Sequence, residues 1–297
     1  MAKKQKKKLP EIEVDTGAEQ LDGIDVDDID FDGLDLDVET VASDTTSPAG
    51  SSLESIADMI KDVDKQPVHA KLLIYGEQGT GKTTFAGTAE GPILFVDCNE
   101  RGTASIRGQG HKVINISDAD QFESLYWYLA SGEHPFKTVV IDTVSNMMDI
   151  AMQKVLDLDE WEGLPIRKHW GQLTQWGKTW FINYRNLPMH VIFLAQLRRI
   201  DEEDAGIDDD YTRVPMLSPA VRAALGAAVD CIGYTYIKSV VGKDKKGNER
   251  LAWRYRLRIG PSNTVLTKMR TAKGVKYKVA LRNPEFKDIV AILKKGE

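Results

Sequence analysis

The stretch that decides the fold runs from Ala70 to Thr84 and reads AKLLIYGEQGTGKTT. Its first six residues are mostly apolar and predict a buried strand over Ala70–Tyr75. The next eight, Gly76–Thr83, fit the pattern G-x-x-x-x-G-K-[ST], in which a glycine-rich turn leads from a strand into a helix. Because glycine tolerates positive φ, backbone N–H groups of such a turn can surround a phosphate at the positive end of the helix. The stretch therefore predicts an α/β protein that binds a nucleotide.

The side chains of this turn have separate predicted roles. Lys82 is expected to reach the β- and γ-phosphates, and the Thr83 hydroxyl is expected to ligate Mg²⁺. The predicted cofactors are therefore ATP and Mg²⁺. The residues expected to bind the nucleotide are Gly76, Glu77, Gln78, Gly79, Thr80, Gly81, Lys82, Thr83 and Thr84.

A second apolar run, Thr138–Asp142, ends in a carboxylate. It reads as a buried strand that neighbours the strand before the glycine-rich turn. A carboxylate at the carboxyl end of such a strand lies near the metal of a nucleotide complex. Asp142 is therefore the predicted partner of Thr83 on the Mg²⁺ side.

Hydrolysis of the γ-phosphate needs a group that polarises water. A strand over Ile93–Asp97 should end at the same edge of the sheet, which makes Asp97 and Glu100 the two candidates. Glu100 is preferred because it lies beyond the strand, where side chains reach the cleft. The alternative is that it is a loop carboxylate without a catalytic role. Gln196, which follows the strand His190–Ala195, is expected to sense the γ-phosphate and relay its presence to the next loop.

The rest of the chain alternates strand and helix patterns, which implies a mostly parallel, doubly wound sheet with helices on both faces. A helix is expected to follow the turn from Lys82. The other expected elements are helices over Leu53–Val63, Asp118–Ser131, Val144–Leu156 and Pro165–Asn186, a strand over Lys112–Ile116, and a final helix over Pro284–Lys294. The Pro165–Asn186 helix has an apolar stripe that we interpret as core rather than as a surface for stacking bases; it comprises Ile166, Trp170, Leu173, Trp180 and Tyr184.

The C-terminal part has a different character. Strand patterns at Ile232–Lys238 and Trp253–Arg258 flank a lysine-rich turn and predict a β-hairpin, and Tyr277–Ala280 suggests one more short strand. Residues 238–297 contain 17 lysines and arginines against 5 acidic residues, a net charge of +12. Such a basic end suggests a polyanionic partner, although a solvated basic hairpin fits the composition as well.

Two segments are candidates for binding single-stranded DNA. In the hairpin, Arg254, Arg256 and Arg258 would share one strand face and Trp253 and Tyr255 the other, with Lys243, Lys245 and Lys246 at the turn. Rows of cations follow a phosphate backbone and aromatic rings stack on unpaired bases, but the two aromatics can equally belong to the core. The second segment, the loop from Arg198 to Arg213, is a candidate only through the family resemblance described below, and its many acidic residues argue against direct phosphate contact.

The N-terminal part is acidic. Residues 1–50 contain 5 lysines and 14 acidic residues, and Ile24–Glu39 alternates acidic and apolar residues. We expect a disordered tail and linker over 1–52, an ATPase core over 53–237, and a basic hairpin and helix over 238–297 that complete the same domain. The tail can dock a basic partner such as a single-strand-binding or replication protein, fold back on the chain's own basic end, or only increase solubility.

Composition excludes several classes. With 42% hydrophobic residues and no run of about 18 apolar residues, the 297-residue chain is expected to be a globular protein without a membrane span. The lysine-rich start lacks an apolar stretch behind it, so no secretory signal is expected. Cys98 and Cys231 have no metal-ligand spacing and are expected to be reduced, buried thiols, which fits a cytoplasmic location.

With these residues in place, the chain resembles the phage RecA-like P-loop ATPases of the Sak-four type, a family of single-strand annealing proteins often described only as AAA-type ATP-binding proteins. The resemblance covers about Lys71 to Arg282. It depends on Gly76–Thr83, FVDCNERGTASIR (Phe95–Arg107), VVIDTVSNM (Val139–Met147), Gln196 and LTKMR (Leu266–Arg270).

The resemblance implies a RecA-like core that forms a homo-oligomeric ring or filament in a bacterial host cell, with ATP between protomers and single-stranded DNA on inner loops. Relatives often have Asp-x-Glu after the second strand, and that Glu activates water. Here Asn99 occupies that position and Glu100 follows it. In such assemblies basic residues reach the neighbour's γ-phosphate, and Lys268 and Arg270 lie at the matching place; the alternative is that they are ordinary surface cations.

Two functions follow as hypotheses. The first is an ATP-dependent, single-stranded DNA-binding protein that promotes annealing or recombination. The alternative is a nucleotide-dependent switch, or a protein like a helicase loader, that acts on replication partners through the acidic tail.

Overall fold

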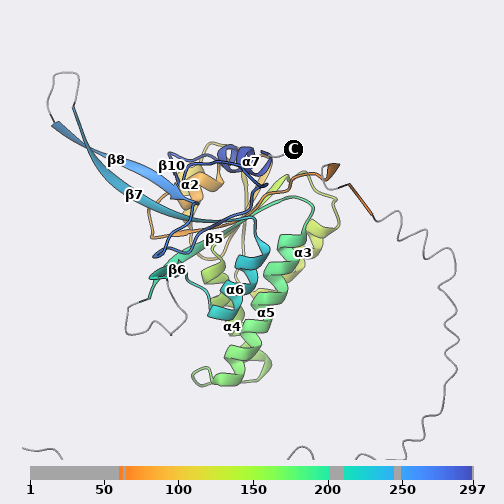
Figure 1. Cartoon of the computed structure of the whole chain (residues 1–297). Helices are drawn as coiled ribbons and strands as arrows, with labels where there is room; N and C mark the ends of the chain where they lie inside the picture. Colours follow the sequence, from red (N-terminus) through yellow and green to blue (C-terminus); the bar gives the residue numbers. More distant parts are fainter. Residues whose placement is uncertain (1–59, 63–64, 201–210, 244–248, 296–297) are drawn as a thin grey trace, which may run out of the picture. The chain divides into compact units, whose positions relative to one another are not determined.

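The structure is a computed structural model that describes residues 60–62, 65–200, 211–243 and 249–295, without the side chains of 242–250. The chain divides into two compact units, residues 1–60 and 61–297. The following account concerns the second unit (Figure 1). Three predicted features lie outside the described residues: the acidic tail, the turn residues Lys245 and Lys246, and most of the Leu53–Val63 helix. Of that helix, only Ile60, Lys61 and Asp62 are described.

Ten strands of the described residues form one sheet in the order β10-β8-β7-β1-β5-β4-β2-β3, with β6 paired to β5 and β9 to β7. The six strands from β7 to β3 along this order are parallel, whereas β8 is antiparallel to β7 and β10 is antiparallel to β8. The strands are β1 (Lys71–Gly76), β2 (Ile93–Asp97), β3 (Lys112–Asn115), β4 (Thr138–Asp142), β5 (His190–Arg199), β6 (Arg213–Pro215), β7 (Cys231–Lys243), β8 (Glu249–Arg258), β9 (Lys268–Met269) and β10 (Ala280–Arg282).

Helices cover both faces of this sheet, and two buried apolar clusters lie beneath them. One cluster packs under α3 (Ala119–Ala130), α4 (Val144–Leu158), α5 (Arg167–Asn186) and α6 (Pro219–Ala228). The other packs under α2 (Lys82–Ala86) and α7 (Phe286–Leu293). A short 3₁₀ helix, η3 (Gly102–Ile106), follows β2. The predicted α/β fold, with its mostly parallel sheet, helices on both faces and C-terminal β-hairpin, is confirmed.

Local sequence signals explain where the helices begin. The Asp118 carboxylate accepts a hydrogen bond from the Gln121 N–H at 2.8 Å and caps α3. The Thr143 hydroxyl oxygen accepts one from the Asn146 N–H at 3.3 Å and caps α4. Both are side-chain N-caps of the kind that aspartate and threonine favour. The Thr143 cap places α4 immediately after the carboxyl end of β4, so the helix begins at the edge where Asp142 lies.

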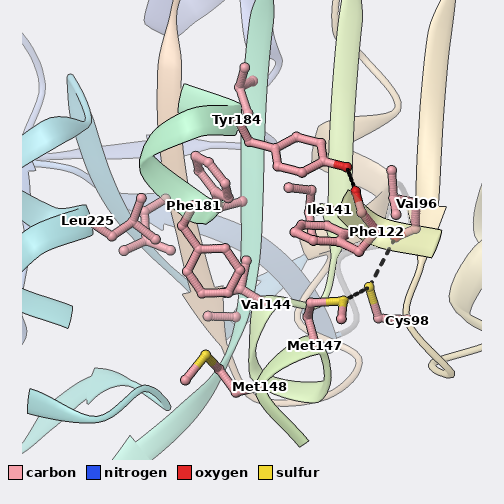
Figure 2. Close-up of a cluster of buried hydrophobic side chains, with 14 of the residues drawn as sticks. Val96, Cys98, Phe122, Ile141, Val144, Met147, Met148, Phe181, Tyr184 and Leu225 are labelled. Atoms are coloured by element: carbon pink, nitrogen blue, oxygen red, sulfur yellow. Dashed lines mark hydrogen bonds between the residues drawn. The ribbon is translucent and has the colours of Figure 1, made fainter. Parts of the chain in front are cut away.

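The largest apolar cluster contains a stacked aromatic pair (Figure 2). The rings of Phe122 and Tyr184 lie 4.3 Å apart, and the buried Tyr184 hydroxyl donates a hydrogen bond of 2.6 Å to the Phe122 carbonyl oxygen. This contact joins α5 to α3 across the face of the sheet. Both cysteines are free and buried as predicted, and Cys98 lies 3.8 Å from the Met147 sulfur in the same cluster.

The structure corrects several sequence predictions. It contains β6, α6, β9 and η3, which were not predicted, and the last short strand is Ala280–Arg282 rather than Tyr277–Ala280. Three of these elements are short, and pairing with a neighbouring strand rather than a local pattern determines where short strands lie. Ile60, Lys61 and Asp62 are not helical.

The predicted core stripe of α5 is wrong at its start. Trp170 is 55% exposed and Ile166 is 45% exposed, whereas Leu173 and Tyr184 are buried. The first turns of α5 extend past the sheet together with the end of α4 (Figure 1), so no strand of the described residues covers them. The helical spacing was correct, but spacing alone cannot show how far the sheet reaches beneath a helix. No helix among the described residues is long and apolar enough to cross a membrane.

We expect Tyr184→Phe to lower the free energy of unfolding by about 1 kcal/mol, because a buried hydrogen bond is lost while the ring stacking on Phe122 is kept. Chemical denaturation would measure the change. The control is Tyr128→Phe on the exposed side of α3, where no loss is expected. Equal stability of the Tyr184→Phe variant and the parent protein would contradict the predicted role of this contact.

Candidate nucleotide-binding site

Register brings the carboxyl ends of the central strands to one edge of the sheet. Gly76, the last residue of β1, pairs with Gln196 on β5 and with Thr235 on β7. On the other side of β5, Asp142 of β4 pairs with Asp97 of β2. The predicted site residues therefore follow neighbouring strands at the edge where ligands of open α/β sheets bind.

The glycines of the turn are required by its shape. Gly79 and Gly81 have φ of +73° and +89°, which only glycine adopts at little cost. A methyl group at Gly76 would come within 2.2 Å of the Thr235 hydroxyl oxygen. The turn is held against β7 by a hydrogen bond of 2.7 Å between the hydroxyls of Thr80 and Thr235. Side chains larger than glycine would thus displace the turn from the sheet.

The buried side chain of Lys82 reaches back to the first residues of the turn. Its ammonium group donates to the carbonyl oxygens of Gly76 at 2.9 Å and Glu77 at 3.0 Å. Burial lowers the pKa of this ammonium, and the nearby carboxylates of Asp142 and Glu100 oppose the shift. The side chain thus lies inside the turn, where a bound phosphate would provide a further partner for its charge.

The predicted Mg²⁺ ligands are neighbours. The Thr83 hydroxyl donates a hydrogen bond of 2.8 Å to Asp142, whose side chain is 5% exposed. Burial raises the pKa of the Asp142 carboxyl to about 6; the Thr83 hydrogen bond lowers it and Glu100 raises it further. A cation beside Asp142 would compensate the buried negative charge.

The donor set fits Mg²⁺ rather than a metal held by protein ligands alone. No group of three or more His, Cys, Asp or Glu residues among the described residues can hold a metal ion. Mg²⁺ in nucleotide sites uses one or two protein oxygens and completes its shell with phosphate oxygens and water. Gly102 keeps the space open, because a Cβ there would lie 3.7 Å from both Thr83 Oγ1 and Asp142 Oδ2.

Glu100 lies at the same site. Its carboxylate accepts hydrogen bonds from the Gln196 amide at 2.5 Å and from the Thr143 hydroxyl at 3.2 Å. The structure therefore brings together the two residues expected to act at the γ-phosphate. Thr143 was not predicted, although its position directly after Asp142 could have indicated it.

Asp97, the other candidate for activating water, has a different environment. It is buried, and its carboxylate accepts the backbone N–H groups of Glu100 at 2.8 Å and Arg101 at 3.1 Å. These bonds support a loop in which Asn99 and Arg101 have positive φ. Asp97 therefore orients the loop that carries Glu100, while the Glu100 side chain faces the cavity.

The predicted site residues line a cavity of about 510 Å³. A second cavity of about 340 Å³ adjoins it beside Thr84 and Tyr255. The first cavity is lined by the turn, Glu100, Asp142, Thr143 and Gln196. The second also includes Asn283 and Pro284, which precede α7. Tyr255 contacts the turn, since a Cβ at Gly81 would lie 3.2 Å from its ring. Sequence reasoning missed the role of Tyr255 and Asn283 here because they lie far along the chain from the turn.

Lys268 and Arg270 are not brought to the site of their own chain. The Lys268 ammonium donates to the carbonyl oxygens of Gly226 at 2.7 Å and Ala227 at 2.9 Å, at the end of α6. Arg270 also donates to Ala227 and pairs with Asp230 at 3.5 Å. Both therefore stabilise the carbonyl end of a helix. Their predicted action on a neighbouring protomer stays a prediction.

The hairpin β7–β8 has two different faces. Arg254, Arg256 and Arg258 alternate with Trp253 and Tyr255 along β8, as predicted. The alternative that both aromatics belong to the core is wrong, because Trp253 is 62% exposed and Tyr255 46% exposed. The hairpin extends beyond the rest of the sheet (Figure 1), so none of the helices that the structure describes covers its far part. The side chain of Lys243 and the acidic residues 201–210 lie outside the described part of the chain.

We expect Asp142→Asn to stabilise the nucleotide-free protein. The folded pKa of about 6 lies above the ordinary value of 3.8, so the charge disfavours folding increasingly as pH rises from about 4 to 6 and by a constant amount above. Two pKa units correspond to about 3 kcal/mol at neutral pH. Denaturation at pH 4 and pH 7 would measure a gain that appears only at pH 7.

The Asp142→Asn variant should also lose the stabilisation that Mg-ATP gives the parent protein. Of the two residues expected on the Mg²⁺ side, Thr83 and Asp142, only Asp142 carries a charge, and the variant removes it. The control is Glu162→Gln, which changes an exposed acidic residue between α4 and α5 and should change neither property. Full stabilisation of Asp142→Asn by Mg-ATP would contradict the assignment of this residue.

A family model and a solved structure are similar to the chain. No curated protein matches the chain. Among solved structures, the flagellar accessory protein FlaH from Methanocaldococcus jannaschii aligns with a TM-score of 0.38 and 12% identity, over 73% of this chain and 85% of that one. A family model described as an AAA domain matches residues 68–271, which include the glycine-rich turn, Glu100, Asp142 and Gln196. Because this match spans more than half of the sequence, the chain belongs to that family of AAA-domain P-loop ATPases.

Proposed function

We propose that the protein binds and hydrolyses Mg-ATP, binds single-stranded DNA on its C-terminal hairpin, and promotes strand annealing or recombination. The observation that carries this proposal is the position of the hairpin. Strand β7 pairs directly with β1, the strand that ends in the phosphate-binding turn, and continues into the hairpin. Strand β7 thus connects the proposed nucleotide site at the end of β1 directly to the cationic surface of the hairpin.

The two adjoining cavities match the parts of a nucleotide. The larger one contains the charged and polar side chains that phosphates require. The smaller one is lined more by apolar atoms and lies beside Thr84, just after the turn, where a base and sugar would follow the phosphates. In this arrangement Tyr255 lies between the two cavities and would contact the sugar or base.

The chemistry of hydrolysis follows from the side chains at the larger cavity. Glu100 would accept a proton from water, and Gln196 and Thr143 hold its carboxylate in place through the hydrogen bonds described above. Lys82 and the amides of the turn would stabilise the charge that develops on the phosphate oxygens. The Mg²⁺ ion, held by Thr83 and Asp142, would supply additional charge neutralisation on the β- and γ-phosphates.

We expect Glu100→Gln to bind ATP like the parent protein but to hydrolyse it at least about 100-fold more slowly, because the amide cannot accept the proton. Steady-state phosphate release and calorimetry with ATP would separate the two properties. Lys82→Ala is the comparison variant, since it should lose nucleotide affinity as well. Hydrolysis by Glu100→Gln at the parent rate would show that another group activates water.

DNA binding is proposed for the face of the hairpin that carries its cations. Lys238 of β7 pairs across the hairpin with Arg254 of β8, and Arg256 and Arg258 follow on the same face. Such a row can neutralise successive phosphates, which makes affinity fall steeply with salt. The test is binding of a labelled single strand with and without ATP at two salt concentrations. Binding that is absent or independent of salt would reject the DNA-binding part of the proposal.

A homo-oligomer with ATP at the protomer interface is the proposed functional form. In it Lys268 and Arg270 would reach the γ-phosphate of the adjacent protomer and stabilise the transition state. ATP state and DNA affinity would then be coupled as two ligands of one assembly.

We expect the double variant Lys268→Ala with Arg270→Ala to hydrolyse ATP at least about 10-fold more slowly while still binding it, because the lost cations act only on the transition state. Because both residues also bind carbonyls at the end of α6, the melting temperature must be measured too. Arg185→Gln, which removes another side-chain donor to Ala228 at this helix end, is the matched control for that structural loss. Normal hydrolysis by a folded double variant would contradict the proposed interface role.

A second candidate function is a nucleotide-dependent switch that acts on a replication partner. The observation in its favour is the opposite face of the hairpin, where Val241, Leu251 and Trp253 are exposed and apolar. The acidic tail is a further candidate contact. Deletion of residues 1–50 separates the two functions, because loss of partner recruitment with DNA binding intact would favour the switch.

A further inference from the structure

A groove of about 550 Å³ also borders the phosphate-binding turn, and it shares Thr80 and Gln78 with the two nucleotide cavities. Glu77, Gln78 and Thr80 of the turn form one of its walls. The remaining walls come from β5, β6, β7, β8 and the segment after β8; they are formed by Arg199, Arg213, Tyr234, Tyr236, Ile237, Arg258 and Val265. The groove thus joins residues from six separate segments, and none of the nucleotide-site roles described above uses its aromatic side chains.

Two tyrosines form an aromatic surface in this groove. Tyr234 and Tyr236 lie two residues apart on one face of β7, with ring centroids 5.6 Å apart and planes inclined by only 12°. Tyr234 also contacts the fully buried Tyr75 at 5.4 Å, which anchors the pair to the core. Both rings are half-buried, so they are fixed in position while part of each remains accessible.

The charges around these rings are mostly positive. Three arginines and one glutamate line the groove, a formal charge of +2. Arg258 lies directly across the hairpin from Tyr234, and its Nε is buried without a hydrogen-bond partner among the described residues. Glu77 pairs with Arg199, and the charges of Arg213, Glu77 and Arg199 all act on the Tyr234 hydroxyl. A ligand that combines aromatic rings with negative charge would satisfy this set of groups.

We propose that this tyrosine–arginine groove binds single-stranded DNA, with bases stacked on Tyr234 and Tyr236 and phosphates paired with Arg213 and Arg258. The inference rests on the proposed function and names the site where the DNA bases bind. It assigns stacking to the face that carries the hairpin cations, and not to Trp253 and Tyr255 on the opposite face. An extended strand can then contact rings and cations at once, as in stacking sites of single-strand-binding proteins.

The position of the groove also provides a route for coupling. The turn borders both the groove and the nucleotide cavity, and Thr80 contacts β7 through Thr235. A DNA phosphate that attracts Arg199 would weaken its ion pair with Glu77, a residue of the turn itself. Binding of DNA and of ATP would therefore alter the same backbone.

The test is the affinity of Tyr236→Leu for a fluorescein-labelled oligothymidylate, measured by fluorescence anisotropy. Loss of one stacked base is expected to weaken binding about 10-fold, within the range of about 1–3 kcal/mol for base–aromatic stacking. Tyr236→Phe should bind within about 2-fold of the parent, since the ring is kept. Trp253→Leu, on the opposite face of the hairpin, is the matched control and should also bind like the parent.

A strand with the same length but without bases provides a readout that a purely structural role would not change. The parent protein should prefer oligothymidylate over the abasic strand, and Tyr236→Leu should lose most of that preference. Arg213→Gln should reduce the slope of log affinity against log salt by about 0.7, the value for one phosphate of a single strand. Melting temperature and ATP binding of each variant would confirm that the fold is intact.

The outcomes separate this inference from the proposed function. If the parent protein does not bind single-stranded DNA, both are wrong. If the parent protein binds it and Tyr236→Leu binds equally well with the same preference for bases, the groove is not the base-binding site while the proposed function stands. If Trp253→Leu alone loses affinity, the opposite face binds the bases.

Discussion

The structure depends on the parallel pairing of β1 with a strand on each side. Because Gly76 lies in register with Gln196 and Thr235, the end of β1 is fixed between two neighbours before the phosphate-binding turn begins. The absence of a side chain at Gly76 is what permits Thr235 to approach so closely. A turn of glycines alone would be free to adopt many conformations, and this pairing restricts it to one. The shape of the phosphate site is thus a consequence of the sheet.

Charge is concentrated at the same edge. Lys82, Asp142 and Glu100 are brought within reach of one another in one cavity, and burial disfavours the charged forms of Lys82 and Asp142. Such an arrangement opposes folding locally and is retained where a ligand completes it. The phosphates and cation of Mg-ATP have the charges that these groups lack. In the proposed function, binding of Mg-ATP would offset the free energy that burial of these charges costs the free protein.

Strand β7 connects the edge of the sheet that carries the phosphate-binding turn to the hairpin. It contacts the turn through Thr235, continues past the end of β1, and becomes one arm of the hairpin. Side chains alternate along it, so Thr235 faces the turn while Tyr234 and Tyr236 face the groove. A change of the turn on binding ATP would reach the hairpin through one strand and not through a series of loops.

Much of this arrangement could be predicted from the sequence because it depends on local patterns. The glycine-rich motif, the apolar runs that end in Asp97 and Asp142, and the alternation of the hairpin are each contained in a few consecutive residues. The residue types in each of these patterns favour one backbone conformation, and they also carry the chemical groups of the site. The sequence by itself therefore determined the fold class, the phosphate turn and the residues on its metal side. Only the tertiary structure decided which distant side chains complete the site. Gln196 and Thr143 hold Glu100, and Tyr255 contacts Gly81. It also decided that Tyr234 shares a groove with Arg199 and Arg213, and that Trp170 is exposed. The physical reason is that strand order and register bring together residues far apart in the chain, and no local pattern encodes which strands become neighbours.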